Sequence, residues 1–331
     1  MRHLLLALAA SLVLAPAALA QVPVPTPTTP APAPGPAAQP QSAKMSVRVI
    51  GASIDHGTRY FVAGQRIPVS GSITPYVAGE KVTVVLYRGK RVASRKRVAT
   101  KQSGNAGTFS LTFPVRKSGS YSVRAYHSAT AAQQKATTRE VPFRAFQGKA
   151  GSGSRGAKVR LLQRNLARMG YVTPRGGSFD GATARAVLAY RKVNGMGRSG
   201  FASKSVFLKA LKGRGSFKLR YPRAGKHVEF DWSRQVLVLA SGGKPQRIYH
   251  ASSGKPSTPT VFGTFRFYRK QPGTNSHGMV FSSYFIRGYA IHGYASVPNY
   301  AASHGCIRVP IPNAVGIYRW IGLGNTIFVY R

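Results

Sequence analysis

Residues 289–308 read YAIHGYASVPNYAASHGCIR, and this stretch decides how the C-terminal third of the chain is interpreted. Its apolar beginning predicts a strand over 289–292, and the loop after it contains Cys306, the only cysteine of the chain. Residues 236–240 and 247–251 flank a Gly-Gly turn and predict a hairpin. Further short strands and one short helix over 312–321 complete the pattern. The sequence therefore predicts a mostly β domain over 216–331 with its chemistry on loops.

The neighbours of Cys306 favour a nucleophilic thiol. His304 and Arg308 lie two residues on either side of it, and positive charge or a partnered imidazole favours the thiolate. Gly305 permits a sharp turn, so that the amides of residues 304–306 would converge on a developing oxyanion. His292 ends the predicted strand and is the candidate general base. These residue types predict acyl transfer through a cysteine.

Two motifs carry a resemblance to a known family. The segment SHGCIRV over 303–309, with IHG over 291–293, resembles the signature of L,D-transpeptidases, which are cysteine enzymes that cross-link peptidoglycan. Residues 230–254 resemble the opening hairpin of that family, and residues 257–265 resemble its "TPxGxF" segment. The resemblance covers the whole of 216–331, and it implies the same β fold.

The resemblance also implies roles for single residues. Cys306 falls on the nucleophile and His292 on the general base, which a backbone carbonyl, here that of Gly293, orients. The remaining signature positions, which would support the site, are Ser303, His304, Gly305 and Arg308. The implied reaction is attack of Cys306 on the amide between the third stem residue and a terminal D-alanine, release of D-alanine, and transfer of the acyl group to an amine of a neighbouring stem. No cofactor is implied.

Three side chains are candidates for binding the substrate. Arg308 would hold a substrate carboxylate, Tyr294 would line the donor groove together with His304, and His277 lies before a predicted strand that leads toward the site. Only ten residues separate His292 from Ser303, so the lid over the site is expected to be short.

The residues leave other functions open. Water in place of the acceptor amine would make the chain an L,D-carboxypeptidase. A zinc peptidase or amidase would use His292, His304 and Cys306 as ligands, although the domain contains only two acids, Glu229 and Asp231. A third alternative is a non-catalytic cationic protein that binds the cell wall.

The N-terminus predicts export. Residues 1–20 combine a basic start, a short apolar run and Ala18-Leu19-Ala20, a pattern typical of a signal peptide that is cleaved before Gln21. Residues 21–43 are rich in Pro, Ala and Thr and predict an extended, disordered linker. We therefore expect a secreted protein in the periplasm or cell wall.

Two further domains precede the β domain. Residues 44–146 alternate over several short runs and predict a small antiparallel sandwich that resembles immunoglobulin-like modules. Residues 147–154 read as a Gly/Ser linker. Residues 155–213 show three short helical patterns and resemble a three-helix peptidoglycan-binding domain, in particular at VRLLQRNLARMGYV over 159–172.

The charge of the chain restricts its partners. Lys and Arg number 49 against 6 acids, a formal net charge of +43, which calls for a polyanionic environment. The excess is even along the chain, with 18 basic residues against 3 acidic in 44–146, 15 against 1 in 147–215, and 15 against 2 in 216–331. A nucleic-acid reader concentrates charge on one module. We therefore expect peptidoglycan as the partner, with anionic wall polymers or a membrane surface, and no nucleic acid.

Overall fold

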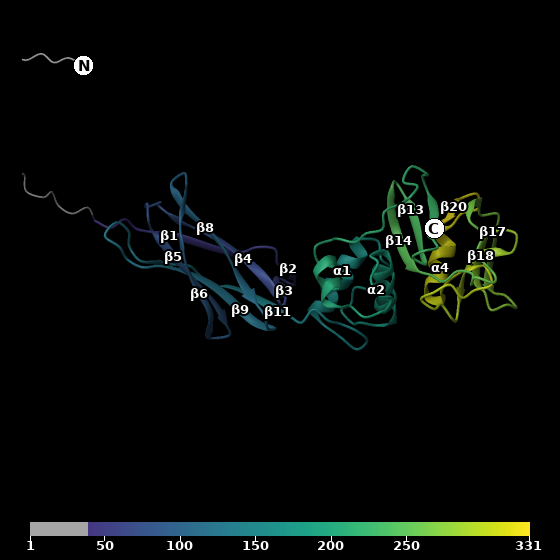
Figure 1. Ribbon diagram of the computed structural model, residues 1–331, viewed down its shortest axis with the longest axis horizontal. Helices are drawn as coiled ribbons and strands as arrows, with labels where there is room; N and C mark the ends of the chain where they lie inside the picture. The colour runs from purple at the N-terminus through teal and green to yellow at the C-terminus, as the bar shows by residue number, and fades with distance from the viewer. Residues whose placement is uncertain (1–38) are drawn as a thin grey trace, which may run out of the picture. The chain divides into compact units, whose positions relative to one another are not determined.

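The computed structural model describes residues 39–331 (Figure 1). The predicted signal peptide and most of the predicted 21–43 linker lie outside the described residues. Within the described part, no helix is long and apolar enough to cross a membrane.

Residues 44–146 form two sheets around one apolar core, as expected for a β-sandwich. Val82, Val84, Phe113 and Val123 of this core are almost completely buried. The first sheet has the order β1(Lys44–Val49), β4(Gln65–Thr74), β8(Ala106–Val115), β7(Lys101–Ser103). The second has the order β2(Ser53–Asp55), β3(Thr58–Val62), β11(Val141–Phe146), β9(Gly119–His127), β5(Lys81–Arg88), β6(Arg91–Ala99), with β10(Ala136–Thr137) paired to β9.

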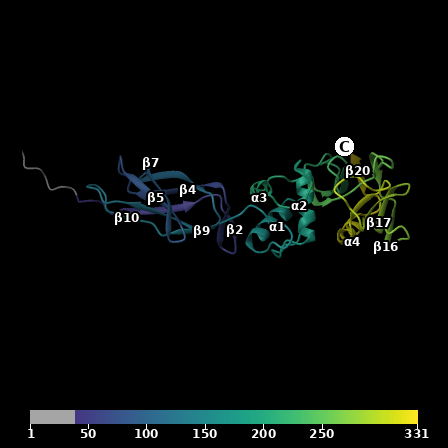
Figure 2. The same ribbon diagram turned by 60° about the horizontal axis from the view of Figure 1, so that its bottom comes forward.

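Three helices follow within the segment 155–213, as predicted: α1(Ala157–Arg168), α2(Gly181–Val193) and α3(Lys204–Ala210) (Figure 2). Asp180 caps α2 by accepting a hydrogen bond from the amide of Thr183 at 2.8 Å. Gly170 follows α1 with φ +95°, a conformation that favours glycine at a helix end. The helices bury Leu162, Leu166 and Tyr190 completely.

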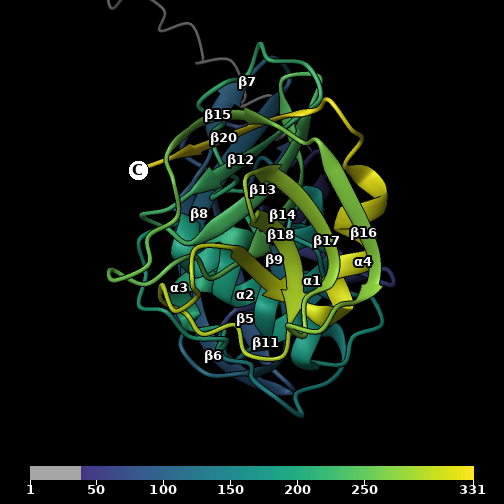
Figure 3. The ribbon, with the colours of Figure 1, turned by 90° about the vertical axis from the view of Figure 1, so that its right-hand side faces the viewer.

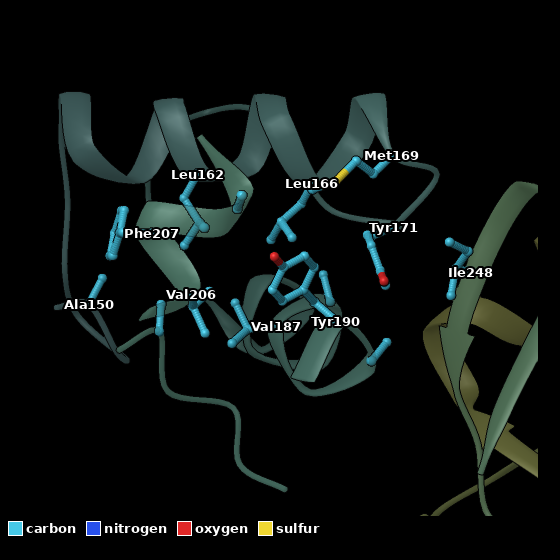
Figure 4. Close-up of a cluster of buried hydrophobic side chains, with 14 of the residues drawn as sticks. Ala150, Leu162, Leu166, Met169, Tyr171, Val187, Tyr190, Val206, Phe207 and Ile248 are labelled. Carbon is cyan, nitrogen blue, oxygen red and sulfur yellow. The ribbon is translucent and has the colours of Figure 1, made fainter. Parts of the chain in front are cut away.

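This helical core continues into the C-terminal domain. Figure 4 shows Ile248 on a strand beside Tyr171, and Val236 and Val238 belong to the same buried cluster. The helices are therefore not an independent bundle, because one face of their core is made by the next domain.

The segment 147–154, expected to be a linker, is partly built into the helical domain. Ala150 is buried and pairs with Ala202 through two backbone hydrogen bonds of 2.9 and 3.0 Å. The Gly and Ser content that suggested a linker instead allows close packing, since a Cβ on Gly151 would lie 3.1 Å from the ring of Phe201.

The C-terminal domain consists of two sheets and one helix. The first sheet has the order β14(Lys244–His250), β13(Val236–Ser241), β12(His227–Asp231), β20(Thr326–Tyr330), β15(Gly263–Arg266). The second has the order β16(Arg269–Thr274), β17(Val280–Ile286), β18(Tyr289–Tyr294), β19(Ile307–Pro310). Helix α4(Ile311–Trp320) packs against β17 and β18 (Figure 3). The two sheets share one core, which includes Phe230, Leu239, Ile291 and Ile307.

Candidate active site

Strands β18 and β19 lie side by side and run in the same direction, and they position the predicted catalytic residues. Their register pairs His292 with Arg308, while Cys306 directly precedes β19. His292 thus lies inside a strand, not at its end as predicted, because β18 continues to Tyr294. The chemistry is therefore held partly by the sheet and not by loops alone.

A cavity of about 260 Å³ opens at this point, and we call it the catalytic pocket. It contains seven side chains that the sequence singled out, together with Met279, which it did not. The lining residues are His277, Met279, His292, Tyr294, Ser303, His304, Cys306 and Arg308.

The imidazole of His292 is held in one tautomer. Its Nδ1 lies 2.9 Å from the carbonyl oxygen of Gly293, and because a carbonyl only accepts, Nδ1 must carry the hydrogen. The Nε2 lone pair is then available as a base. Burial lowers the pKa of His292 to about 4 against the usual 6.5, and the nearby Arg308 acts in the same direction. The ring is therefore neutral and basic near pH 7.

Cys306 is half-buried and lines the same pocket. Its Sγ lies 3.7 Å from the carbonyl oxygen of Gly288, within reach of a weak thiol hydrogen bond. Burial raises the pKa of the Cys306 thiol, while the Ala290 backbone and Arg308 oppose that shift. At rest the site therefore pairs a neutral thiol with a neutral imidazole.

Ser303 and Gly305 shape the turn before the cysteine. The Ser303 hydroxyl donates to the carbonyl of Cys306 at 2.6 Å, and it accepts the amide N–H of Gly305 at 3.1 Å. The Gly305 amide therefore already has a hydrogen-bond acceptor within the turn. Of the three amides predicted to bind an oxyanion, those of His304 and Cys306 are left for that role. Gly305 has φ +121°, and a Cβ there would lie 2.3 Å from the ring of Tyr289, so only glycine fits.

A second segment clamps this turn from outside. The hydroxyl of Thr260 is buried, donates to the carbonyl of Gly305 at 2.6 Å and accepts the amide of Gly254 at 2.9 Å. The hydroxyl of Thr258 donates to the carbonyl of Ser303 at 3.0 Å. In the sequence these two threonines stand out only as part of the "TPxGxF"-like segment over 257–265. Their spacing shows no periodicity that predicts a contact 45 residues away.

The substrate-binding candidates lie on the rim of the pocket. The guanidinium of Arg308 stacks over the ring of Tyr294 at 4.1 Å, and that ring meets His292 edge-on at 5.7 Å. His277 is exposed in a turn where Asn275 accepts its amide. The arrangement offers one cation and one aromatic face beside the thiol.

The zinc alternative needs three ligands in one place. Across residues 39–331 no group of three His, Cys, Asp or Glu side chains is close enough to hold a metal ion together.

Comparisons with known proteins agree with this geometry. Residues 225–329 match the YkuD family model, described as "L,D-transpeptidase catalytic domain". Residues 155–207 match the model described as "Putative peptidoglycan binding domain". Among curated proteins none matches the chain.

Solved structures also resemble parts of the chain. An L,D-transpeptidase from Xylanimonas cellulosilytica is 30% identical with a TM-score of 0.52, covering 56% of this chain and 98% of its own. An L,D-transpeptidase from Stackebrandtia nassauensis is 20% identical with a TM-score of 0.36, covering 55% and 95%. A C442S mutant of the Enterococcus faecium L,D-transpeptidase is 23% identical with a TM-score of 0.29, covering 32% and 50%.

The fold and the pocket define a β domain with an imidazole on β18 and a thiol directly before the parallel neighbouring strand β19. With the match to the Xylanimonas structure over nearly its whole length, the chain belongs to the L,D-transpeptidase family.

Proposed function

We propose that the chain is an exported L,D-transpeptidase that cross-links peptidoglycan through a thioester on Cys306. The observation that carries this proposal is the hydrogen bond from His292 Nδ1 to the Gly293 carbonyl, which leaves Nε2 as a base in the pocket that contains the thiol. The substrate is proposed from the two family matches, one catalytic and one peptidoglycan-binding.

The reaction needs only groups of this pocket and the two stems. Sγ attacks the carbonyl carbon of the third stem residue while His292 takes the thiol proton. The imidazolium then gives that proton to the departing amine of D-alanine, the C–N bond breaks, and a thioester remains. An amine of a second stem attacks the thioester, loses a proton to His292, and the C–S bond breaks as the thiol regains it. No oxidant or cofactor enters the balance.

The electrostatics of the site favour attack only when substrate is present. Both partners are neutral at rest, so proton transfer from Cys306 to His292 creates a charged pair in a buried place, which costs free energy. A bound acyl group would take up the negative charge as it forms, with the amides of His304 and Cys306 as donors. Arg308 would hold a stem carboxylate beside Tyr294.

The test is incubation of the mature protein with a tetrapeptide-stem muropeptide, followed by mass spectrometry. We expect a cross-linked dimer that has lost one D-alanine, and a transient adduct on Cys306. Release of a tripeptide alone would show an L,D-carboxypeptidase. Cys306→Ala, the matched control, should give neither product; turnover by that variant, or none by the wild type, would contradict the proposal.

Export and location belong to the same proposal. The N-terminal pattern supports removal of residues 1–20 and release into the periplasm or cell wall. N-terminal sequencing of the protein recovered from the cell envelope should begin at Gln21. An envelope protein that still begins at Met1 would contradict cleavage, and recovery from the cytoplasm would contradict export.

The sandwich domain, which we take as immunoglobulin-like, is proposed to contact anionic wall polymers. A cavity of about 520 Å³ in this domain is lined by the hydroxyls of four serines and one threonine, by Arg48 and Lys101, and by apolar side chains, with no acid. The Arg48 guanidinium donates to Ser70, and Ser46 and Ser72 share a hydrogen bond of 2.9 Å. Hydroxyls and cations in one groove suit a polymer with anionic and hydroxyl groups.

A further inference from the structure

A second cavity lies between the helical domain and the catalytic domain, and we call it the α2 groove. Its volume is about 420 Å³, within the usual range for ligand sites. Helix α2 contributes two of its side chains, and the catalytic domain contributes the rest. The lining residues are Arg185, Leu188, His250, Tyr294, Ala295, Val297, Pro310, Ile311 and Pro312.

A buried hydrogen-bond network from α2 fixes the wall of this groove. Lys192, 3% exposed, places Nζ 2.8 Å from His250 Nδ1 and 3.1 Å from the carbonyls of Gln235 and Ala251. The other ring nitrogen of His250 donates to the carbonyl of Val297 at 2.9 Å. Nδ1 is therefore the acceptor, and Nζ of Lys192 is the donor to it and lies within hydrogen-bond distance of the two carbonyls. Burial lowers the pKa of Lys192 to about 6. Since Val297 belongs to the loop between β18 and β19, α2 holds that loop in place.

A second contact from the helical domain holds the same loop farther along. Arg198 donates to the carbonyl of Asn299 at 2.7 Å, and the Asn299 amide donates back to the Arg198 carbonyl at 3.1 Å. From the catalytic domain, the Ser252 hydroxyl donates to the carbonyl of Tyr300 at 2.6 Å. Hydrogen bonds from both domains therefore hold the loop that forms one wall of the groove.

The chemistry of the lining indicates an anionic peptide. None of the ion pairs or side-chain hydrogen bonds found in residues 39–331 uses Arg185. Its guanidinium lies at the start of α2, where a Cβ on Gly181 would be 3.3 Å away, and it helps to lower the pKa of Asp180. Because it forms no ion pair with Asp180, it can still bind another carboxylate. Leu188, Val297 and Ile311 add apolar surface for small aliphatic side chains, and the lining contains no acid.

The groove adjoins the catalytic pocket, because Tyr294 lines both. We propose that the α2 groove binds the carboxylate-bearing stem peptide of a peptidoglycan strand next to Cys306, with Arg185 as the specificity-determining cation. This proposal rests on the proposed function, and it assigns the helical domain a direct part in the substrate site.

The test uses the full mature chain with Cys306→Ala, so that no turnover occurs. A tetrapeptide-stem muropeptide is titrated by calorimetry, and Arg185→Gln is compared with Arg168→Gln, which removes the same charge from an exposed position on α1. We expect Arg185→Gln to weaken binding about tenfold, equivalent to ~1.4 kcal/mol, and Arg168→Gln to leave the Kd within twofold.

A second readout separates this proposal from the proposed function. With Cys306 intact, Arg185→Gln should raise the KM for the muropeptide while the rate of thiol alkylation by iodoacetamide stays at the wild-type value. Wild-type Kd and KM in Arg185→Gln would overturn the groove while leaving the transpeptidase intact. Absence of cross-linking in the wild type would instead refute the proposed function.

Discussion

At the scale of single residues, burial rather than ion pairing sets the chemistry of the site. His292 is 3% exposed and has a carbonyl, not a carboxylate, as its orienting partner. A carbonyl fixes the tautomer without the full negative charge that would raise the pKa of the ring. The result is a base that stays neutral well below the usual pKa of histidine.

The pH profile of the reaction should show this shift. The base must be unprotonated to accept the thiol proton, so activity falls as the pH drops through the pKa of His292, about 4. We expect kcat/KM for the muropeptide to have its acid limb near pH 4 rather than near 6.5. An acid limb centred at pH 6.5 would show that burial does not lower the pKa of the catalytic base.

Thr260 provides a sharper test of the turn before the cysteine. Thr260→Val keeps the shape but leaves the Gly305 carbonyl and the Gly254 amide without their buried partner, which costs about 1–3 kcal/mol. We expect a lower melting temperature and at least tenfold slower cross-linking. Thr260→Ser keeps the hydroxyl and is the control; equal loss in both variants would contradict a role of the two hydrogen bonds.

At the scale of elements, sequence periodicity predicted the helices and the hairpin well. β13 begins at residue 236 as predicted, and α4 lies within one residue of the predicted 312–321. β12, β16 and β19 were not predicted as strands. β12 is only five residues long and has three polar or charged residues, His227, Glu229 and Asp231, which the fold nevertheless buries. β16 has a bulge and is largely exposed, and β19 is only four residues long.

The site was foreseen as a set of residues but not as an arrangement. The signature around Cys306 named most of the lining of the pocket, because those residues are close in sequence. Other contacts join residues that lie 16 to 58 positions apart in the sequence. They are the hydrogen bond from Thr260 to Gly305, the close approach of Tyr289 to Gly305, and the Lys192–His250 pair. Such long-range partners leave no local pattern, since only the fold brings them together.

The shared core of the helices and β14 should make the two domains unfold together. Leu162→Ala removes a fully buried side chain from that core and should cost about 2–5 kcal/mol. We expect calorimetry to show the helical and catalytic domains in one transition that moves to lower temperature. As a control, Arg168→Ala at an exposed position should leave the temperature of this unfolding transition unchanged. A separate unfolding transition of the catalytic domain that Leu162→Ala does not shift would contradict a shared core.

At the scale of the whole molecule, the buried histidines make the free energy of unfolding depend on pH. The pKa of His292 is about 4 and that of His250 about 3, lowered by burial and, for His250, by Lys192. Both values lie below 6.5, so the unfolded chain binds more protons between pH 6.5 and 4. The contribution of these two rings to stability is therefore full above pH 6.5 and is lost as the pH falls.

This predicts a melting temperature that decreases from pH 6.5 to pH 4. His292 alone should contribute about 3 kcal/mol over this interval, because its pKa falls from 6.5 to about 4 on folding. His250→Gln should reduce the slope of the free energy of unfolding against pH by about 1.4 kcal/mol per pH unit. A flat melting temperature in the wild type, or an unchanged slope in the variant, would show that these rings are not neutral when folded.

The charge of the whole molecule predicts strong salt dependence of its adsorption. With +43 formal charges, binding to purified walls that carry anionic polymer should weaken at least tenfold between 50 and 200 mM salt, because screening acts on exposed charges. Sedimentation with such walls measures this. Walls stripped of anionic polymer are the control, and equal retention on both would contradict the polyanion as partner.

Five of the six acidic side chains already have partners within the fold. Asp55, Glu80 and Asp231 pair with Arg160, His127 and Arg234, respectively. Asp180 caps α2, and Glu229 accepts the backbone amides of Arg220 and Tyr221. Only Glu140 is left to offer negative charge to a second copy. Neighbouring copies on one surface therefore repel each other within a Debye length, about 10 Å at 0.1 M salt. Mutual repulsion would space the molecules apart and keep them from clustering at one point of a strand.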